Sequence, residues 1–392
     1  MQSQNDSPYF KYVVDLLKVL LEKNGSDLFI TVDAPPSMKI HGEMTPVGSK
    51  PVSREQAEEL VAAVMNEKQR AEFRETKECN FALGLPGIGR FRMNAYVQRG
   101  SPGMVARTIT TTIPTIDSLG LRSVLPVPDA AELKNHPDIL SKLVMEKRGL
   151  ILMVGGTGSG KSTSLAAMID YRNENSRGHI ITIEDPVEYV HQHKKCLVMQ
   201  REVGVDTDNW FAALKNTLRQ APDVIYIGEI RDRETMEYAI AFAETGHLCM
   251  GTLHANNANQ AMDRIINFFP MERRQQLFMD LSMNLRAVIS QRLIPKKGGG
   301  RIAAIEIMIG TPLIQDLILK GEVHELKPII ARSNNLGMQT FDQALFRLCE
   351  KGLVDQDVAI KNADSPNDLR LMLKNLAGGY GLSEAASKLS IE

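Results

Sequence analysis

The sequence of 392 residues has few aromatic side chains and no surplus of either charge. Aromatic residues make up only 5%, which disfavours a motor acting on single-stranded nucleic acid, because such proteins stack bases on aromatic rings. Lysine and arginine number 46 against 47 acidic residues, whereas duplex-DNA binders usually carry a basic surplus. We therefore expect no nucleic-acid partner.

Cysteine is scarce, and the four that occur, at positions 79, 196, 249 and 349, are widely separated. No two have the spacing of zinc ligands, and the thiols are too sparse for a disulfide scaffold. No apolar run approaches the ~18 residues of a membrane span, and the first residues lack the basic and apolar regions of a signal peptide. We therefore expect a chain in the reducing cytoplasm that contacts a membrane only through partners.

The sequence contains enough apolar residues for packed cores, at 43% of the chain, and its length predicts about two or three domains. In the first part, helices are expected at 9–23 and 55–65, the second begun by a capping box of Ser53 and Gln56. Strands are expected at 28–32, 38–41, 91–98 and 104–109. This mixture predicts a small α+β domain over residues 1–112, followed by a linker at 113–117.

The second part of the chain alternates short apolar strands with helices over residues 118–362. Strands are expected at 150–154, 180–183, 224–227 and 248–253, and further helices at 271–290 and 312–320. Strands that are apolar throughout are typical of a parallel sheet covered by helices on both faces, so the fold class is α/β. Residues 363–392, with a short helical patch at 369–376, are predicted to form an appended tail.

One glycine-rich segment carries the chemistry, because it matches the P-loop pattern G-x-x-x-x-G-K-[ST] between a strand and a helix. Its glycines let successive N–H groups point at phosphate oxygens, and the helix that follows adds its positive end. Lys161 is predicted to reach the β- and γ-phosphates of ATP, and the Ser162 hydroxyl to bind Mg²⁺. The predicted nucleotide-binding residues are Gly155, Gly156, Thr157, Gly158, Ser159, Gly160, Lys161, Ser162 and Thr163.

Acidic residues follow two of the other apolar strands. Glu229 ends the strand at 224–227, which we expect beside the P-loop strand, where its carboxylate would hold Mg²⁺, through water, or the attacking water. Glu184 and Glu188 follow the strand at 180–183, and one of these acids could orient water for attack on the γ-phosphate. An acidic surface turn would also explain that second group.

Histidines and arginines supply further candidates. His247 and His254 flank the strand at 248–253, where either could sense the γ-phosphate or the state of a neighbouring subunit, or could be structural. Four arginines cluster on the expected strands of the first domain: Arg90, Arg92, Arg99 and Arg107. They could be solvated surface charges or arginine fingers, which reach a nucleotide held by another domain or subunit.

Taken together, these segments closely resemble the type IV pilus retraction ATPases of the PilT/PilU family, within the secretion ATPases. The similar segments are 25–28 with Pro35 and Pro36, 90–95, the acidic stretch 183–191, 228–232 and the histidine-rich stretch 245–254. They occur in the family's order between residues 10 and 360 or so, which makes the resemblance specific.

The resemblance implies a PAS-like N-terminal domain joined to a RecA-like ATPase domain, assembled as a ring hexamer. It implies that Glu188 is the catalytic glutamate, that Glu229 is the Walker B acid, and that Arg92 and Arg107 are the fingers. The implied activity is Mg²⁺-dependent ATP hydrolysis that drives pilus retraction and twitching motility. The implied partners are a sister PilT-type ATPase and the platform protein of the inner membrane, at whose cytoplasmic face the ring would sit.

The sequence also departs from typical PilT. Gly156 stands where relatives usually carry proline, 255–258 reads Ala-Asn-Asn-Ala, and 313–317 reads Leu-Ile-Gln-Asp-Leu. These differences favour the PilU-like, accessory branch of the family. Three alternatives stay open: an assembly or secretion ATPase of the same fold, a RecA-type nucleic-acid motor, and a protein that uses ATP only as a structural ligand.

Overall fold

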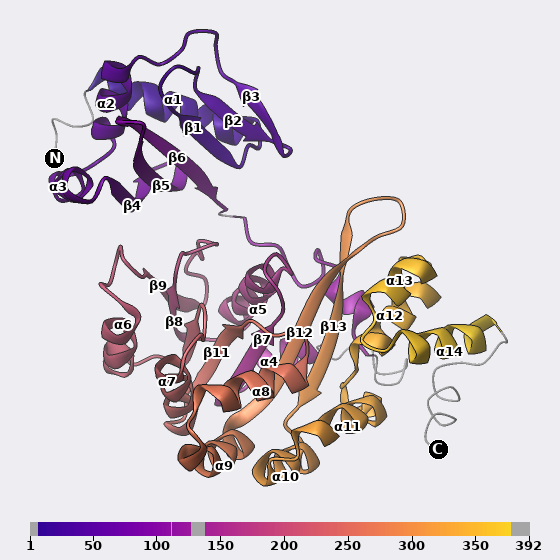
Figure 1. Cartoon of the computed structure of the whole chain (residues 1–392). Coiled ribbons are helices and arrows are strands. Elements are labelled where there is room, and N and C mark those ends of the chain that lie inside the picture. The colour runs from indigo at the N-terminus through magenta and orange to yellow at the C-terminus, as the bar shows by residue number, and fades with distance from the viewer. Residues whose placement is uncertain (1–6, 111, 127–137, 378–392) are drawn as a thin grey trace. The chain divides into compact units, whose positions relative to one another are not determined.

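The computed structural model describes residues 7–110, 112–126 and 138–377, and the expected tail beyond 377 lies outside the described residues (Figure 1). The chain forms two compact units. The first comprises Met1–Thr112, Glu188–Val190 and Gly204–Asp206. The second comprises Ile113–Val187, His191–Val203 and Thr207–Glu392. No helix of the described residues is long and apolar enough to cross a membrane.

The first unit is an α+β domain whose six strands form one antiparallel sheet in the order β3-β2-β1-β6-β5-β4. Its elements are α1 (Pro8–Glu22), β1 (Asp27–Ile30), β2 (Ser37–Ile40), β3 (Glu43–Pro46), α2 (Arg54–Ala63), α3 (Glu67–Thr76), β4 (Glu78–Leu85), β5 (Gly89–Gln98) and β6 (Ser101–Ile109).

The core of this unit lies between one face of the sheet and the apolar faces of α1 and α2. Alternate residues of β5 are buried, as the pleat of a strand with one covered face requires: Phe91, Met93 and Ala95. The predicted capping box is confirmed, since the Gln56 N–H donates to Ser53 Oγ at 3.2 Å while the Ser53 N–H donates to Gln56 Oε1 at 3.0 Å.

The second unit is an α/β domain built on a seven-stranded sheet in the order β13-β12-β7-β11-β10-β8-β9. All neighbouring strands are parallel except β12 and β13. Its strands are β7 (Gly149–Val154), β8 (Gly178–Glu184), β9 (Cys196–Glu202), β10 (Val224–Ile227), β11 (Leu248–Leu253), β12 (Leu285–Pro295) and β13 (Arg301–Ile309).

Helices cover both faces of this sheet, as the all-apolar strands predict. The α-helices are α4 (Ile139–Val144), α5 (Lys161–Asn175), α6 (Trp210–Thr217), α7 (Arg233–Glu244), α8 (Ala258–Phe268), α9 (Arg274–Asn284), α10 (Pro312–Lys320), α11 (Leu326–Arg332), α12 (Phe341–Glu350), α13 (Gln356–Asn362) and α14 (Pro366–Ala377). Short 3₁₀ turns are η1 (Leu121–Val124), η2 (Leu218–Gln220), η3 (Met271–Arg273), η4 (Val323–Glu325) and η5 (Asn334–Leu336).

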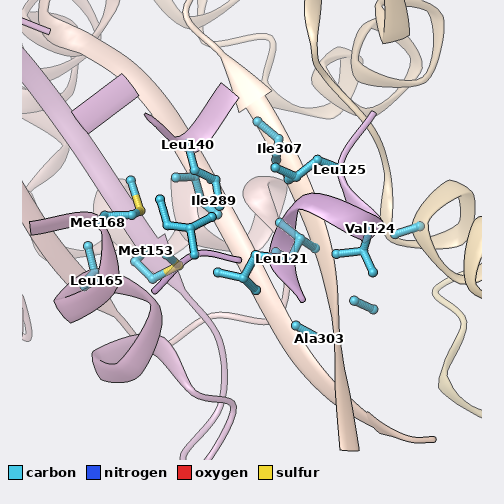
Figure 2. Packing of buried hydrophobic residues seen from close by; sticks show 14 of the residues in the cluster. Leu121, Val124, Leu125, Leu140, Met153, Leu165, Met168, Ile289, Ala303 and Ile307 are labelled. Atoms are coloured by element: carbon cyan, nitrogen blue, oxygen red, sulfur yellow. The ribbon is translucent and has the colours of Figure 1, made fainter. Parts of the chain in front are cut away.

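Two hydrophobic cores result, one on each face of the sheet. Helices α6 to α11 cover one face. On the other face, α4, α5, η1 and the C-terminal helices pack on the sheet, including Met153 of β7, Ile289 of β12 and Ile307 of β13. Figure 2 shows part of this second core, in which side chains from η1, α4 and α5 pack on those of β7, β12 and β13. The labelled residues include Leu121, Leu140, Met153, Leu165, Met168, Ile289 and Ile307.

Two expectations about this unit are wrong. The helix predicted at 271–290 ends at Asn284, and the chain continues as β12 through Pro295, between β7 and β13. The apolar residues of that segment have a spacing that fits both a helix and a strand. Pairing with the neighbouring strands β7 and β13 makes the segment a strand. The second error concerns order in the sheet: β10, which precedes Glu229, is separated from the P-loop strand β7 by β11.

The first part of the expected C-terminal tail packs onto the second unit. Helix α14 lies against α12 and α13, and its Leu369 and Leu373 are buried in the core on that face of the sheet. In Figure 1 these helices stand beside the long hairpin formed by β12 and β13. The C-terminal helices therefore share a hydrophobic core with β12, the strand that runs next to the P-loop strand β7.

Candidate nucleotide site

The candidate site lies at the carboxyl edge of the parallel sheet, where several strands end in polar residues. The P-loop follows β7, His254 follows β11, Glu229 follows β10, and Glu184 is the last residue of β8. Because these strands are parallel and in register, their carboxyl ends meet at one edge, as expected for ligand sites in open α/β sheets. The topology thus gathers residues that are far apart in the sequence.

The P-loop curls tightly between β7 and α5, and two of its glycines are required by that shape. Gly160, with φ 85°, caps the N-terminus of α5 in a left-handed conformation that favours glycine. A Cβ on Gly155 would lie 2.4 Å from Ser159 Oγ and 2.5 Å from the Gln291 carbonyl oxygen, so no larger residue fits. Gly156, Thr157 and Gly158 form the exposed crest of the loop.

Lys161 is folded against the loop that precedes it. Its Nζ donates to the carbonyl oxygens of Gly155 at 2.8 Å and Gly156 at 3.0 Å. Burial lowers the pKa of Lys161, and the negative charge of Glu229 opposes this by raising it. The ammonium therefore lies within electrostatic reach of Glu229, at the place where a phosphate would bind.

The residues of the loop fit the phosphates of a nucleotide. The Ser159 hydroxyl is buried and has no hydrogen-bond partner within the part of the chain that the structure describes, which leaves its proton free for a ligand oxygen. The first turn of α5 adds the positive end of a 15-residue helix. Ser162 in that turn is half-buried, so its hydroxyl is available as a metal ligand. Thr163, also half-buried, follows it.

Glu229 and His254 come from neighbouring strands and contact each other. His254 Nε2 lies 3.4 Å from Glu229 Oε1, and both side chains remain about one-third exposed, at 38% and 36%. Thr252 on β11 fixes the intervening backbone, because its carbonyl accepts from the Ile230 N–H at 2.8 Å and its hydroxyl donates to the Gly228 carbonyl. The pair is thus held at the carboxyl edge and stays accessible to water.

Glu184 is placed differently, because its carboxylate is buried. Its Oε1 accepts from Thr182 Oγ1 at 2.7 Å and from Gln200 Nε2 at 3.1 Å. A carboxylate held by two donors is fixed in direction, which suits a positioning role at the end of β8 better than proton transfer with bulk water.

Three predicted site residues belong to the first unit: Glu188, Arg92 and Arg107. Arg92 on β5 lies directly opposite Arg107 on β6, so the two share the face of the sheet that does not pack on α1 and α2. Arg107 Nε donates to the buried Asp27 carboxylate at 2.7 Å, while its side chain stays 66% exposed. Their roles toward a nucleotide remain predictions.

His247 lies at the amino ends of the parallel strands, whereas the P-loop lies at their carboxyl ends. It precedes β11, whose first residue pairs with Gly149 at the start of β7. Its Nδ1 is 3.2 Å from the Phe242 carbonyl and 3.1 Å from Thr245 Oγ1, which ties it to the end of α7. Within one chain it is therefore remote from the γ-phosphate position.

Gln291 and Arg292 were not predicted as site residues, because the sequence was expected to form a helix up to residue 290 and no strand after it. Both lie on β12 beside the P-loop, and the Gln291 amide bonds to Ser159 and Ser164. The signal that could have found them is the run of β-branched and apolar residues at 285–294, which ends in proline and has no helix-capping residue.

Known proteins place this architecture in a family. The model of the type II/IV secretion system proteins matches residues 2–305. The chain is 59% identical to the type IV pilus ATPase PilU of Pseudomonas aeruginosa over 380 residues, which cover 96% of each protein. It is 42% identical to the retraction ATPase PilT of the same organism, over 91% of this chain and 99% of PilT.

Solved structures agree with that assignment. The crystal structure of the pilus retraction motor PilT with bound ADP matches with a TM-score of 0.81 and 39% identity, covering 91% of this chain and 98% of that one. The ATPase DotB of Legionella pneumophila matches with a TM-score of 0.75 and 25% identity, covering 89% and 94%. The chain therefore belongs to the type II/IV secretion ATPase family, in the branch of the type IV pilus ATPases PilU and PilT.

Proposed function

We propose that this protein is a Mg²⁺-dependent ATPase that powers or assists the retraction of type IV pili. The observation that carries the proposal is the intact chemistry at the carboxyl edge. There, the P-loop, Lys161 and the Glu229–His254 pair lie together, in a chain 59% identical to PilU. A protein that used ATP only as a structural ligand would not need to keep these groups accessible to water.

Each residue has a part in this proposal. The N–H groups of residues 155–160 and the Lys161 ammonium bind the phosphates. The Ser162 hydroxyl, and Glu229 through water, would hold Mg²⁺, which offsets negative charge on the phosphates when it is bound. Glu188 orients or deprotonates the attacking water, and Glu184 positions that acidic segment. His254 holds the Glu229 carboxylate in place.

We further propose a ring hexamer made of a PAS-like domain at 1–112, a linker at 113–117, a RecA-like domain at 118–362 and a C-terminal segment at 363–392. In the ring, Arg92 and Arg107 of one subunit would stabilise charge on the nucleotide of another. The partners are a PilT-type sister ATPase and the platform protein at the cytoplasmic face of the inner membrane. Contact with the membrane occurs through those partners, and nucleic acid is not a partner.

The test is complementation of a strain that lacks this gene. Wild-type protein should restore the normal zone of twitching motility and normal retraction of individual pili. Lys161→Ala, expressed to the same level, should fail to do so, because the phosphates lose their cation. Full complementation by Lys161→Ala would show that nucleotide turnover here is not needed for retraction and would overturn the proposal.

A further inference from the structure

A buried glutamine on the neighbouring strand β12 holds the P-loop by hydrogen bonds. Gln291 on β12 is 2% exposed, and its Nε2 donates to the Ser159 carbonyl oxygen at 2.8 Å. Its Oε1 accepts from the Ser164 hydroxyl at 2.8 Å. One amide therefore joins the last turn of the loop to the first turns of α5, with both of its polar atoms engaged.

The same residue also packs closely on two glycines of the loop. A Cβ on Gly155 would lie 2.5 Å from the Gln291 carbonyl oxygen, and a Cβ on Gly160 would lie 2.8 Å from its Nε2. Both glycines at the ends of the phosphate-binding turn thus pack directly on Gln291. The pairing of Ser290 with Val154 sets this approach, because Val154 is the last residue of β7 and Gln291 is therefore the first residue of β12 beyond it.

We propose that Gln291 is a positioning residue for nucleotide binding. It fixes the Ser159 and Gly160 peptide units so that the N–H groups of the loop converge on the phosphates. It acts through the loop and touches no reacting atom. The inference rests on the proposed function, in that the ligand is the di- or triphosphate chain of a nucleotide.

The physical reason is preorganisation. A loop rich in glycine has many accessible conformations, and a ligand must offset the cost of ordering it. The two buried hydrogen bonds of Gln291 restrict the loop before the nucleotide binds. Water does not readily replace these bonds, because the amide is buried. Replacing Gln291 by methionine keeps the length of the side chain but removes both bonds, so the Ser159 carbonyl and the Ser164 hydroxyl lose their partner.

The experiment measures the dissociation constant for ADP by titration calorimetry on the full-length protein. We expect Gln291→Met to bind ADP about tenfold more weakly than wild type, as the loss of such hydrogen bonds allows. Steady-state kinetics should show a higher KM for ATP with a smaller change in kcat, since the loop binds substrate and transition state alike.

Gln339→Met is the matched control. Gln339 is also a fully buried glutamine of the second unit, with Nε2 bonded to the carbonyls of Val124 and Ile305. The same substitution there should lower the melting temperature comparably and leave the ADP dissociation constant unchanged. An equal loss of ADP affinity in both variants would mean that Gln291 matters only for general stability, which would overturn the proposal.

A second variant covers the case in which Gln291→Met fails to fold. Ser164→Ala removes one of the two bonds and should weaken ADP binding about threefold. Where both variants fold, the double variant should bind as weakly as Gln291→Met alone, because both act through one amide. Unchanged ADP binding in Ser164→Ala, or additive effects, would contradict the inference. Absence of ADP binding by wild-type protein would instead overturn the proposed function itself.

Discussion

At the scale of single residues, the carboxyl edge of the parallel sheet combines a buried cation with an acidic residue and a histidine that are partly exposed to water. Lys161 is buried and has a lowered pKa, whereas Glu229 and His254 remain partly exposed. This arrangement suits hydrolysis, since the cation must meet a phosphate and the carboxylate must meet water. Because different residues meet the phosphate and the water, substitutions can affect nucleotide binding and ATP turnover separately.

Glu229→Gln should bind ATP but turn it over very slowly. The amide keeps the size of the side chain and removes the charge that would orient water or hold a hydrated metal ion, so we expect a fall in kcat of at least about a hundredfold. Single-turnover hydrolysis and nucleotide binding would be measured on the same sample. Glu237→Gln, on the exposed surface of α7, is the matched control. Normal turnover by Glu229→Gln would remove this residue from the mechanism.

A second prediction at this scale concerns pH and the buried Glu306 on β13. Its Oε1 accepts from the Ala258 N–H at 2.7 Å and lies 3.3 Å from Ser290 Oγ. Burial raises the pKa of Glu306 to about 7, Asp364 adds to the shift, and Lys327 opposes it. As the pH rises from the ordinary value near 4.5 toward 7, the unfolded state releases this proton first, so the protein loses stability.

Glu306→Gln should abolish that loss, because the amide resembles the protonated acid. We expect the variant to be more stable than wild type at pH 8, by up to roughly 3 kcal/mol, and nearly equal to it at pH 5. Thermal denaturation of both proteins across this pH range measures the difference in stability. The contributions of other titrating groups are shared by the two proteins and cancel in that difference. A difference that does not depend on pH would show that folding does not shift the pKa of Glu306.

At the scale of elements, β12 joins the nucleotide site to the C-terminal helices. Gln291 contacts the P-loop, and the next residue, Arg292, contacts other segments. Its guanidinium donates to the Asn256 carbonyl at 3.1 Å, the Asn362 carbonyl at 3.0 Å and the Asp364 carboxylate at 2.6 Å. It also lies 4.1 Å from the centre of the Phe341 ring. One strand thus holds the P-loop, the segment after His254 and the last helices together.

Arg292→Met should loosen the C-terminal helices. The substitution leaves Asp364 without its closest cation and removes two bonds to carbonyls, so we expect a loss of about 2 kcal/mol. Hydrogen exchange should quicken in α13 and α14 more than elsewhere in the second unit. Arg301→Met, at the exposed start of the neighbouring strand β13, should change stability by less than about 0.5 kcal/mol. Unaltered exchange in α13 and α14 would contradict this account of β12.

Local signals in the sequence were enough for much of the fold. The capping box at Ser53, the P-loop and the apolar strands depend on residues close together in the chain, and all were predicted. The identity of β12 and the role of Gln291 depend on contacts between distant segments, since Gln291 lies 132 positions from Ser159. The order of β10 and β11 likewise follows from how the connecting helices pack, which no short pattern encodes.

At the scale of the whole molecule, the proposed ring requires arginines that act between subunits. Arg92 and Arg107 lie opposite each other on one sheet face of the first unit, and Arg107 also holds the buried Asp27. Arg92 is therefore the cleaner residue to test, since its replacement removes no ion pair that the structure contains among the described residues.

Arg92→Ala should slow ATP turnover by the assembled protein about tenfold or more and leave the affinity of a single subunit for ATP unchanged. Arg74→Ala, an exposed arginine on α3, serves as control and should behave as wild type. Turnover at the wild-type rate in Arg92→Ala would exclude this residue as a finger acting between subunits.

The most direct test of the central claim is steady-state ATP turnover by the purified protein, with oligomer size measured in the same sample. We expect a hexamer that hydrolyses ATP, stops when EDTA removes Mg²⁺, and loses activity in Lys161→Ala. Binding of ATP without turnover, by a protein of any size, would contradict the claim that this protein is by itself a Mg²⁺-dependent ATPase. It would leave the nucleotide as a structural ligand until a partner activates the ring.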